Sequence, residues 1–416
     1  MRIDNNPLSV KRVKRNRKWN KKKTFILITF IVIPSLVLGL YGGNELRKAV
    51  DYFAHLCKVP EYYDFISSYD KDFAQTVYFP KLKWLRTDNE NVYDPGYDDV
   101  IRVAFMTKYN RAKLADLVAL LSGRDFDAKD FKSEIIEDTY TKLKDGVLQV
   151  INEYNFKNFM QAIRSAGFIS PKLVNSEMAI DFAYTLYLRL QKTKEVSVSE
   201  YKRLIQKWYV LSVLTGRYSG SPETAFYRDI RLISENGIVN TLKSIEDAVL
   251  SDNFWDVGIV QNLSYTSVNN PTYQVYLAAQ VFFNDVSLLS NSTTVRDLIT
   301  SIGDVHHIFP KAYLKNNNFE KSKYNQEGNY AFLDTQVNKD IGDDAPCVYF
   351  PKAFKQCEDK NIVCGSITDL EQLKKNLADN CIPEEVSEMD YTRYEEFLTK
   401  RRILMAQKIK KFYYSL

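Results

Sequence analysis

Apolar residues recur at three- and four-residue intervals from Asn44 to about Leu250, and this spacing constrains the fold more than any other feature. A period near 3.6 residues gives a helix one apolar face, so the spacing predicts amphipathic helices that bury this face against one another. The clearest segments are 44–57, 110–123, 133–154, 169–191 and 201–216. The predicted fold class is therefore a mainly α-helical body.

Local signals predict where some of these helices begin and end. Gly123 and Gly216 follow the last apolar residues of two segments, where a glycine readily closes a helix. Ser170 stands before Pro171, which predicts an N-cap followed by proline at the first helical position. Gly, Ser and Pro cluster with several charges at 215–231, and three interpretations stay open there: a loop with solvated charges, a structured joint, or a phosphate-contacting loop.

The charge of the chain is uneven. Its net charge is +5, but residues 1–23 hold ten Lys or Arg and one acid, so the rest carries a net of −4. The body therefore has no overall basicity that would indicate nucleic-acid binding, and DNA binding would need a local basic patch. The five cysteines include no CxxC pair, and we interpret them as mostly reduced thiols, which favours a body built for the cytosol.

Residues 24–41 form an uncharged, mostly apolar run. Eighteen residues span about 27 Å as a helix, the short end for a membrane segment. Membrane insertion is favoured over a signal peptide or a buried core helix, because no A-x-A site follows and no polar face is present. Ten bases before a single span would place the body outside the cell, which conflicts with an enzyme that acts on DNA inside it. The predicted localisation is thus either cytoplasmic or membrane-anchored, with membrane contact through 24–41.

Two of the three histidines, His306 and His307, are adjacent in "GDVHHIFPKAYL" (303–314). Pro310 soon after the pair is typical of a strand that ends there. "NYAFLDTQVNKDI" (329–341) then predicts a short strand, a turn, and a helix that begins near Asn338. The order of strand, loop, strand and helix outlines a small ββα unit.

The residue types in this unit suit phosphodiester hydrolysis. That reaction needs a base that activates water and a cation that stabilises charge on the phosphate and the leaving oxygen. Histidine suits the base because its pKa lies near neutrality. Mg²⁺ prefers oxygen ligands such as Asp and Asn, and a His ligand widens the choice to Mn²⁺, Ni²⁺ or Zn²⁺.

The segment resembles the HNH (ββα-metal) nuclease motif and, more narrowly, the C-terminal nuclease part of GmrSD-type modification-dependent restriction endonucleases. The resemblance rests on D-x-H-H-I-F-P-K from Asp304 onward and on two asparagines downstream. It extends over 41–416 through "GRYSGSPE" and "NPTYQVYLAAQVFFNDVSLLS", which are similar to the linker and helical part of these enzymes.

The resemblance implies a role for each residue of the motif. The general base falls on His307, and the metal ligands fall on His306 and Asn338. Asn329 falls on the residue that supports the loop, and Asp304 on an acidic residue that orients its neighbours. The implied cofactor is a divalent metal, Mg²⁺ before Mn²⁺, Ni²⁺ or Zn²⁺, and the implied substrate is DNA, including base-modified DNA.

One part of the family pattern has no counterpart here. Members begin with a ParB-like domain that binds and hydrolyses nucleotide, whereas residues 1–41 are a basic tail and an apolar run. We therefore expect a truncated or rearranged gene product, with a separate ParB-like nucleotide-binding subunit as a candidate partner. The leading hypothesis is a metal-dependent DNA endonuclease of the restriction and phage-defence kind. The alternatives are a remnant that binds metal or DNA without cutting, and an exported HNH nuclease.

The predicted organisation has four parts. They are the tail and apolar segment at 1–41, a helical domain at 42–290, the HNH module at 291–355 and a C-terminal helical extension at 356–416. The end of the extension, 391–416, is rich in Lys and Arg and predicts a terminal helix. Its basic face either is solvated or contacts phosphates.

Overall fold

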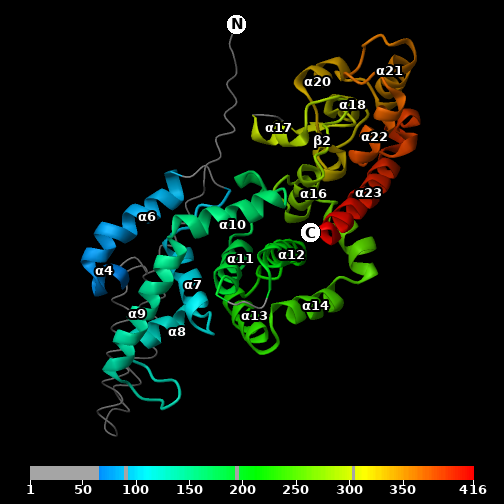
Figure 1. The fold of residues 1–416 in the computed structure, drawn as a ribbon. Coiled ribbons are helices and arrows are strands. Elements are labelled where there is room, and N and C mark those ends of the chain that lie inside the picture. The colour runs from blue at the N-terminus through cyan, green and yellow to red at the C-terminus, as the bar shows by residue number, and fades with distance from the viewer. Residues whose placement is uncertain (1–64, 89–91, 193–195, 302–304) are drawn as a thin grey trace. The chain divides into compact units, whose positions relative to one another are not determined.

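The part of the chain that the structure describes is mainly helical, as the apolar spacing predicts (Figure 1). The computed structural model describes residues 65–88, 92–192, 196–301 and 305–416. Contacts divide the chain into the units Met1–Pro60 and Glu61–Leu416, and every described residue belongs to the second. The predicted membrane segment 24–41, the predicted helix at 44–57 and Asp304 lie outside the described residues. Within the four described ranges, every helix is too short or too polar to span a bilayer.

The helices of the body follow one another closely. The first are α4 (Phe65–Tyr69), α5 (Lys71–Phe73), η3 (Ala74–Tyr78), α6 (Phe79–Lys83), η4 (Trp84–Asp88), α7 (Tyr97–Lys108), α8 (Leu114–Leu121), α9 (Ser133–Val150) and α10 (Glu153–Ser165). They continue with η5 (Pro171–Leu173), α11 (Glu177–Leu190), α12 (Val198–Thr215), α13 (Pro222–Asn236), α14 (Ile238–Val249), η6 (Phe254–Ile259), α15 (Val260–Asn262) and α16 (Pro271–Phe282).

Two short strands are embedded among the later helices. These elements are α17 (Val295–Thr300), β1 (Val305–His307), α18 (Lys311–Asn316), α19 (Lys321–Tyr324), η7 (Glu327–Asn329), β2 (Tyr330–Phe332) and α20 (Thr335–Ile341). The chain then forms α21 (Pro346–Asp359), α22 (Leu370–Asp379), η8 (Glu384–Glu388), η9 (Tyr391–Arg393) and α23 (Tyr394–Ser415).

Helix α11 is buried on nearly every side, because it has almost no polar face. It packs against α7 and α12, and Phe182 stacks on Trp208 and Phe226 with ring centroids 5.6 and 5.3 Å apart. Its one buried carboxylate, Asp181, accepts from Arg102 at 2.8 Å. The aromatic residues of these helices therefore pack in the hydrophobic core, where they stabilise the body and do not form a binding site.

The helix boundaries confirm one prediction and correct another. Gly216 ends α12 in the left-handed region, at φ +59°, where a glycine has no Cβ to clash. Ser170 is the N-cap of η5, accepts from the Lys172 N–H and is followed by Pro171 at the first position, as predicted, but η5 is a short 3-10 helix and not the start of the long helix. The long helix α11 begins six residues after Pro171, at Glu177.

The segment 215–231 is a structured joint between α12 and α13. The Arg217 guanidinium donates through Nε and Nη2 to both carboxylate oxygens of Asp229, each at 2.6 Å. The hydroxyl of Tyr218 donates to the same carboxylate at 2.9 Å, and Asp229 is fully buried. Arg217 is therefore committed to its internal partner rather than to a phosphate, whereas Arg228 and Arg231 of the same segment remain largely exposed.

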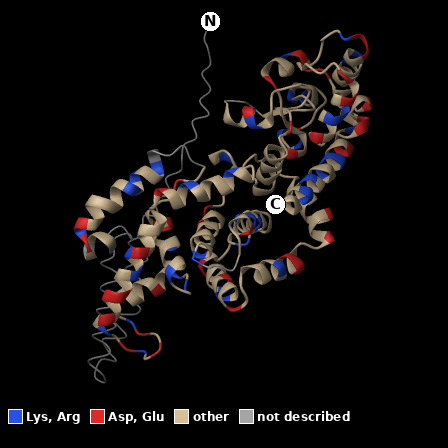
Figure 2. Cartoon of the chain, viewed as in Figure 1, with Lys and Arg blue, Asp and Glu red and all other residues tan. Residues whose placement is uncertain are grey.

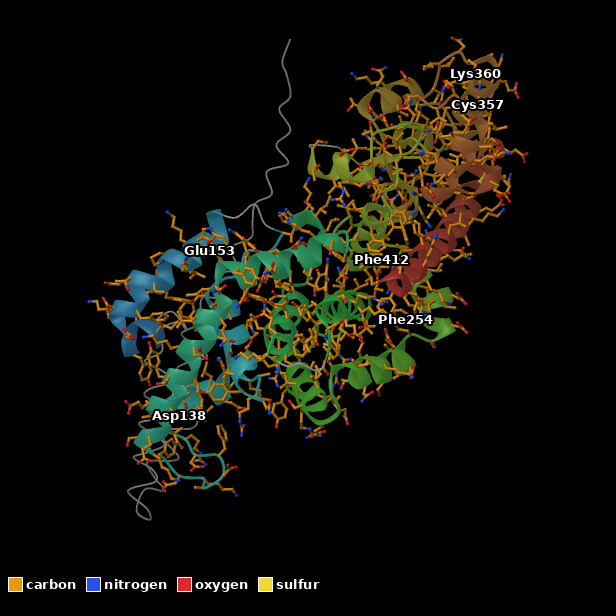
Figure 3. All side chains as sticks on the ribbon, viewed as in Figure 1. Asp138, Glu153, Phe254, Cys357, Lys360 and Phe412 are labelled. Atoms are coloured by element: carbon orange, nitrogen blue, oxygen red, sulfur yellow. The ribbon has the colours of Figure 1, made fainter. Side chains whose placement is uncertain are left out.

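The C-terminal helix α23 contacts both the helices of the body and the segment that leads into β2. It packs against α16, η6 and α12 of the body and against η7 beside β2. Phe412 near its end packs edge-on against Phe282 of α16, with centroids 5.2 Å apart, and Figure 3 shows the side chains that fill the space around it. Figure 2 shows Lys and Arg spread along this helix. Its bases largely contact the protein: Lys400 pairs with Glu385 at 2.8 Å and Lys408 with the Asp379 carbonyl at 2.7 Å.

Candidate active site around the histidine pair

The strands β1 and β2 place the histidine pair in an antiparallel ribbon. Val305, His306 and His307 lie opposite Phe332, Ala331 and Tyr330, respectively. Side chains alternate between the two faces of a strand, so His307 shares a face with Tyr330 and His306 shares the other with Ala331. The pair therefore serves two different surroundings, although its members are neighbours in the sequence.

The helix that follows β2 begins earlier than the sequence predicts. Asp334 accepts from the Gln336 N–H at 3.1 Å and caps α20, so the helix starts at Thr335 rather than near Asn338. Asn338 consequently lies in the second turn of α20, half-buried. The chain thus runs from β1 through α18, α19 and η7 to β2 and α20, so short helices stand where the sequence predicts a loop between the two strands.

Asn329 fixes the backbone just after the histidine pair. It is fully buried, and its Oδ1 accepts from the Phe309 N–H at 2.8 Å while its Nδ2 donates to the Phe309 carbonyl at 3.1 Å. A further bond from Nδ2 reaches the Tyr324 carbonyl at 3.1 Å. Its own carbonyl accepts from the Ile308 N–H at 2.9 Å. One side chain therefore ties together the end of β1, α19 and the start of β2.

His307 is held in one orientation by polar and aromatic contacts. Its Nε2 lies 2.9 Å from Oδ1 of Asn325, and its ring packs edge-on against the Tyr330 ring with centroids 5.2 Å apart. Because an amide oxygen only accepts, Nε2 carries the proton and Nδ1 keeps its lone pair. Burial lowers the pKa of His307 below its ordinary value, and the charges of Lys311 and His306 lower it further. The imidazole is therefore neutral at pH 7 and able to accept a proton at Nδ1.

His306 lies on β1 and Asn338 on α20, and both residues are half-buried. Val337, beside Asn338, belongs to the same buried cluster as Ala331, the residue opposite His306. Imidazole nitrogen and amide oxygen are both donors that divalent cations accept. Among the described residues, no three His, Cys, Asp or Glu side chains gather into a group that could hold a metal. Asp304, the predicted carboxylate, lies outside those residues.

A buried polar cluster on η7 borders β2. Glu327 is fully buried, its Oε2 accepts from Asn270 Nδ2 at 2.9 Å, and its Oε1 meets no hydrogen-bond donor in the described chain. Burial raises the pKa of Glu327 to about 8, although Arg402 nearby opposes this. The carboxyl is therefore largely protonated at neutral pH.

Arg401 of α23 supports the outer edge of β2. Only 1% of it is exposed, and its Nη1 donates to the carbonyls of Gly328 at 2.9 Å and Tyr330 at 2.7 Å. The Tyr330 carbonyl points away from β1, so the arginine bonds the outer edge of β2, where the Leu288 N–H also donates to the Phe332 carbonyl at 3.1 Å. The C-terminal helix thus takes part in building the ribbon that carries His307.

Sequence reasoning did not find Asn325, Glu327 or Arg401. Asn325 stands in "KYNQEGNY" without a spacing that distinguishes it from the other asparagines of the loop. Arg401 is one of several bases in the terminal segment. Its partner Tyr330 is 71 residues away, so no local pattern indicates the contact. Glu327 stands in the polar turn "NQEGN" (325–329), where nothing in the sequence marks it as buried.

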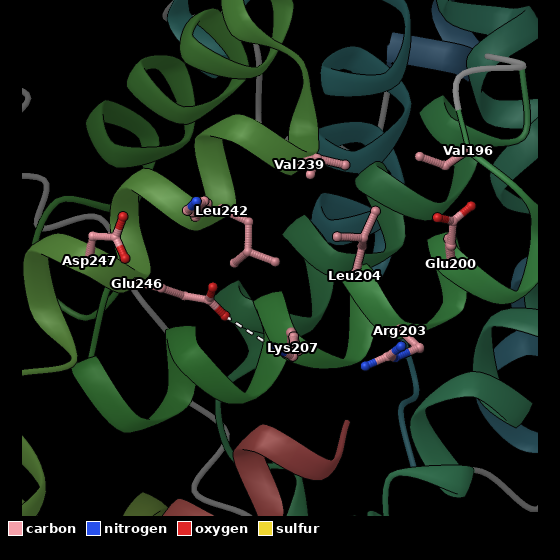
Figure 4. A pocket seen from close by; sticks show the side chains of 10 residues that line it. Val196, Glu200, Arg203, Leu204, Lys207, Val239, Leu242, Glu246 and Asp247 are labelled. Atoms are coloured by element: carbon pink, nitrogen blue, oxygen red, sulfur yellow. Dashed lines mark hydrogen bonds and ion pairs between the residues drawn. The ribbon is translucent and has the colours of Figure 1, made fainter.

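A pocket of about 400 Å³ lies elsewhere, between α12 and α14 (Figure 4). Leu204 and Leu242 line it, and the Lys207 ammonium lies 3.5 Å from a Glu246 carboxylate oxygen across it. Three bases and three acids balance one another among its lining residues, and none of these is a histidine or cysteine. The pocket has no imidazole that could accept a proton near neutral pH or bind a metal, so the ribbon with the histidine pair is the better candidate for chemistry.

Comparisons with known proteins give no match: none of the known protein families, curated proteins or solved structures is significantly similar to the chain. The chemistry of the site therefore rests on its own residues.

Proposed function

We propose that the chain is a metal-dependent DNA endonuclease of the HNH type, of the restriction and phage-defence kind. The observation that carries the proposal is the pair of hydrogen bonds from the Asn329 side chain to the backbone of Phe309, two residues after His307. These residues lie in a segment where two paired strands are followed by a helix. A buried amide that bonds both the N–H and the carbonyl of one residue fixes the end of β1, and a reacting imidazole needs such a fixed support. Asn329 acts as a positioning residue, because it is buried away from any substrate.

His307 is the general base in this proposal. Asn325 holds Nε2–H, so Nδ1 faces the reaction and takes a proton from the attacking water. The lowered pKa keeps the imidazole neutral and ready to accept that proton at physiological pH. The edge-on contact with Tyr330 restricts rotation of the ring, which maintains the orientation of Nδ1 between turnovers.

A divalent cation would be held by His306 and Asn338, with Asp304 as the acidic residue that orients its neighbours. One imidazole and one amide oxygen are donors that Mg²⁺ or Mn²⁺ can accept, and they leave positions for water and phosphate. When bound, the cation supplies Lewis-acid stabilisation of the charge on the phosphate and the leaving oxygen. The face shared with Ala331 keeps His306 apart from the proton-accepting side of the ribbon.

Plasmid nicking by the full-length chain tests the proposal. Supercoiled DNA should be cut in Mg²⁺ or Mn²⁺, and His307→Ala should abolish cutting while circular dichroism stays unchanged. Asn338→Ala should shift the metal concentration needed for cutting upward, whereas Asn316→Ala, at an exposed position on α18, should not. Full activity of the His307 variant would refute the base assignment, and DNA binding without turnover would favour the non-cutting alternative.

A further inference from the structure

Three lysines after the histidine pair form no ion pair with a described carboxylate. Lys311, Lys315 and Lys321 are exposed on α18 and α19. Two other lysines of the region are paired: Lys323 pairs with Glu395 at 3.7 Å, and Lys352 of α21 pairs with Asp344 at 2.6 Å. An ammonium group without a local counter-charge is the kind of group that an anionic partner can neutralise.

One of these lysines, Lys311, lies near the proposed base. The Lys311 Nζ is 6.0 Å from the centroid of the Tyr324 ring, and that ring is 6.4 Å from the His307 ring. Lys311 and His307 therefore flank one aromatic side chain. Lys315 follows Lys311 by four residues on α18, so both project from the same side of the helix.

The local charge contrasts with the rest of the body. Residues 311–324 hold four lysines and one acid, Glu320, whereas the chain beyond residue 23 carries a net of −4. The sequence left open whether a basic patch exists, and the structure brings Lys311, Lys315 and Lys321 onto two consecutive short helices. We refer to these three side chains as the lysine face.

We propose that the lysine face binds the phosphates of duplex DNA and holds the strand across His307. This inference rests on the proposed nuclease function and names the surface that receives its substrate. Contacts of this kind carry no sequence information, but they fix the position and register of the duplex. They also predict a strong salt dependence, because each neutralised phosphate releases a counterion.

Fluorescence anisotropy with the full-length chain tests the inference. A labelled DNA duplex is titrated in EDTA, which prevents cutting, over a series of salt concentrations. Each of Lys311→Gln, Lys315→Gln and Lys321→Gln should reduce the slope of log K against log salt by roughly 0.9. Lys355→Gln, an equal change of charge at an exposed position on α21, should leave the slope unchanged. The basic residues before 24 are common to all variants, so they cancel in the comparison.

The outcomes separate this inference from the function on which it rests. If the triple variant keeps the wild-type slope while His307→Ala loses plasmid nicking, the lysine face is wrong and the nuclease stands. If the slope falls while the wild type never cuts, the DNA-binding surface stands and the nuclease falls. A slope change seen with single-stranded RNA and not with duplex DNA would overturn the choice of partner.

Discussion

Glu327 makes a sharp prediction about stability and pH. Burial raises the pKa of this carboxyl from an ordinary value near 4.5 to about 8. Between those values the folded chain binds a proton that the unfolded chain has released. Stability therefore falls as pH rises through this window, and Glu327→Gln should remove the fall. Glutamine matches the protonated carboxyl in shape and still accepts from Asn270.

The expected loss of unfolding free energy follows from the difference between the two pKa values. A shift of one pKa unit corresponds to about 1.4 kcal/mol, so a shift from near 4.5 to about 8 can lower the free energy of unfolding by roughly 5 kcal/mol at most. Local relaxation and water entry reduce this value, and we expect about 2–3 kcal/mol. The charged groups that face Glu327 do not titrate in the window: Arg402 stays cationic, and the pKa values of Tyr273 and Tyr330 are raised by burial.

Urea unfolding of the full-length variant and wild type measures the difference. The two proteins should be about equally stable near pH 5, and the variant should be more stable by about 2–3 kcal/mol near pH 8. Glu320→Gln, the same change at an exposed position, should show no such trend. A difference that is the same at both pH values would refute the protonated state of Glu327.

Three further substitutions test the packing. Arg401→Met should lower the free energy of unfolding by roughly 2–4 kcal/mol, because two buried carbonyls lose their donor; an unchanged urea midpoint would contradict this. Gly167→Ala should unfold at clearly lower temperature, since its Cβ would lie 2.0 Å from a carbonyl oxygen at φ +93°, while Gly220→Ala, with nothing within 4 Å, should not. Asp229→Ala should cost roughly 3–5 kcal/mol by stranding Arg217, and adding Arg217→Met should recover part of it in the same assay.

Local patterns predicted the helical body because helices are stabilised by neighbours three and four residues apart. The glycine after Thr215 ends α12 as expected, since the requirement for a left-handed residue is local too. Ser170 and Pro171 show the limit of such signals: they favour a helix start, but tertiary packing allows only a short turn there. Asp334 is a typical N-cap residue, and it starts α20 at Thr335, earlier than the predicted start near Asn338.

The order of the residues in the candidate site can be read from the sequence, but the long-range contacts that surround them cannot. His307 and Asn329 are 22 positions apart, and their order is visible in the sequence. The contacts of Asn270 with Glu327 span 57 residues and those of Arg401 with Tyr330 span 71. No periodicity reports contacts of that range, because they depend on how separate helices pack. The helices α18 and α19, which carry the lysine face, likewise lay within a segment that looked like a loop.

The reach of Arg401 across 71 residues also has a consequence for synthesis on the ribosome. At about 5–20 residues per second, roughly 4 to 14 seconds pass between the addition of Tyr330 and that of Arg401. During that interval the outer edge of β2 has no guanidinium against it, and unprotected strand edges pair readily with other chains. The nascent protein therefore passes through a period in which this edge of β2 is open to pairing with other chains.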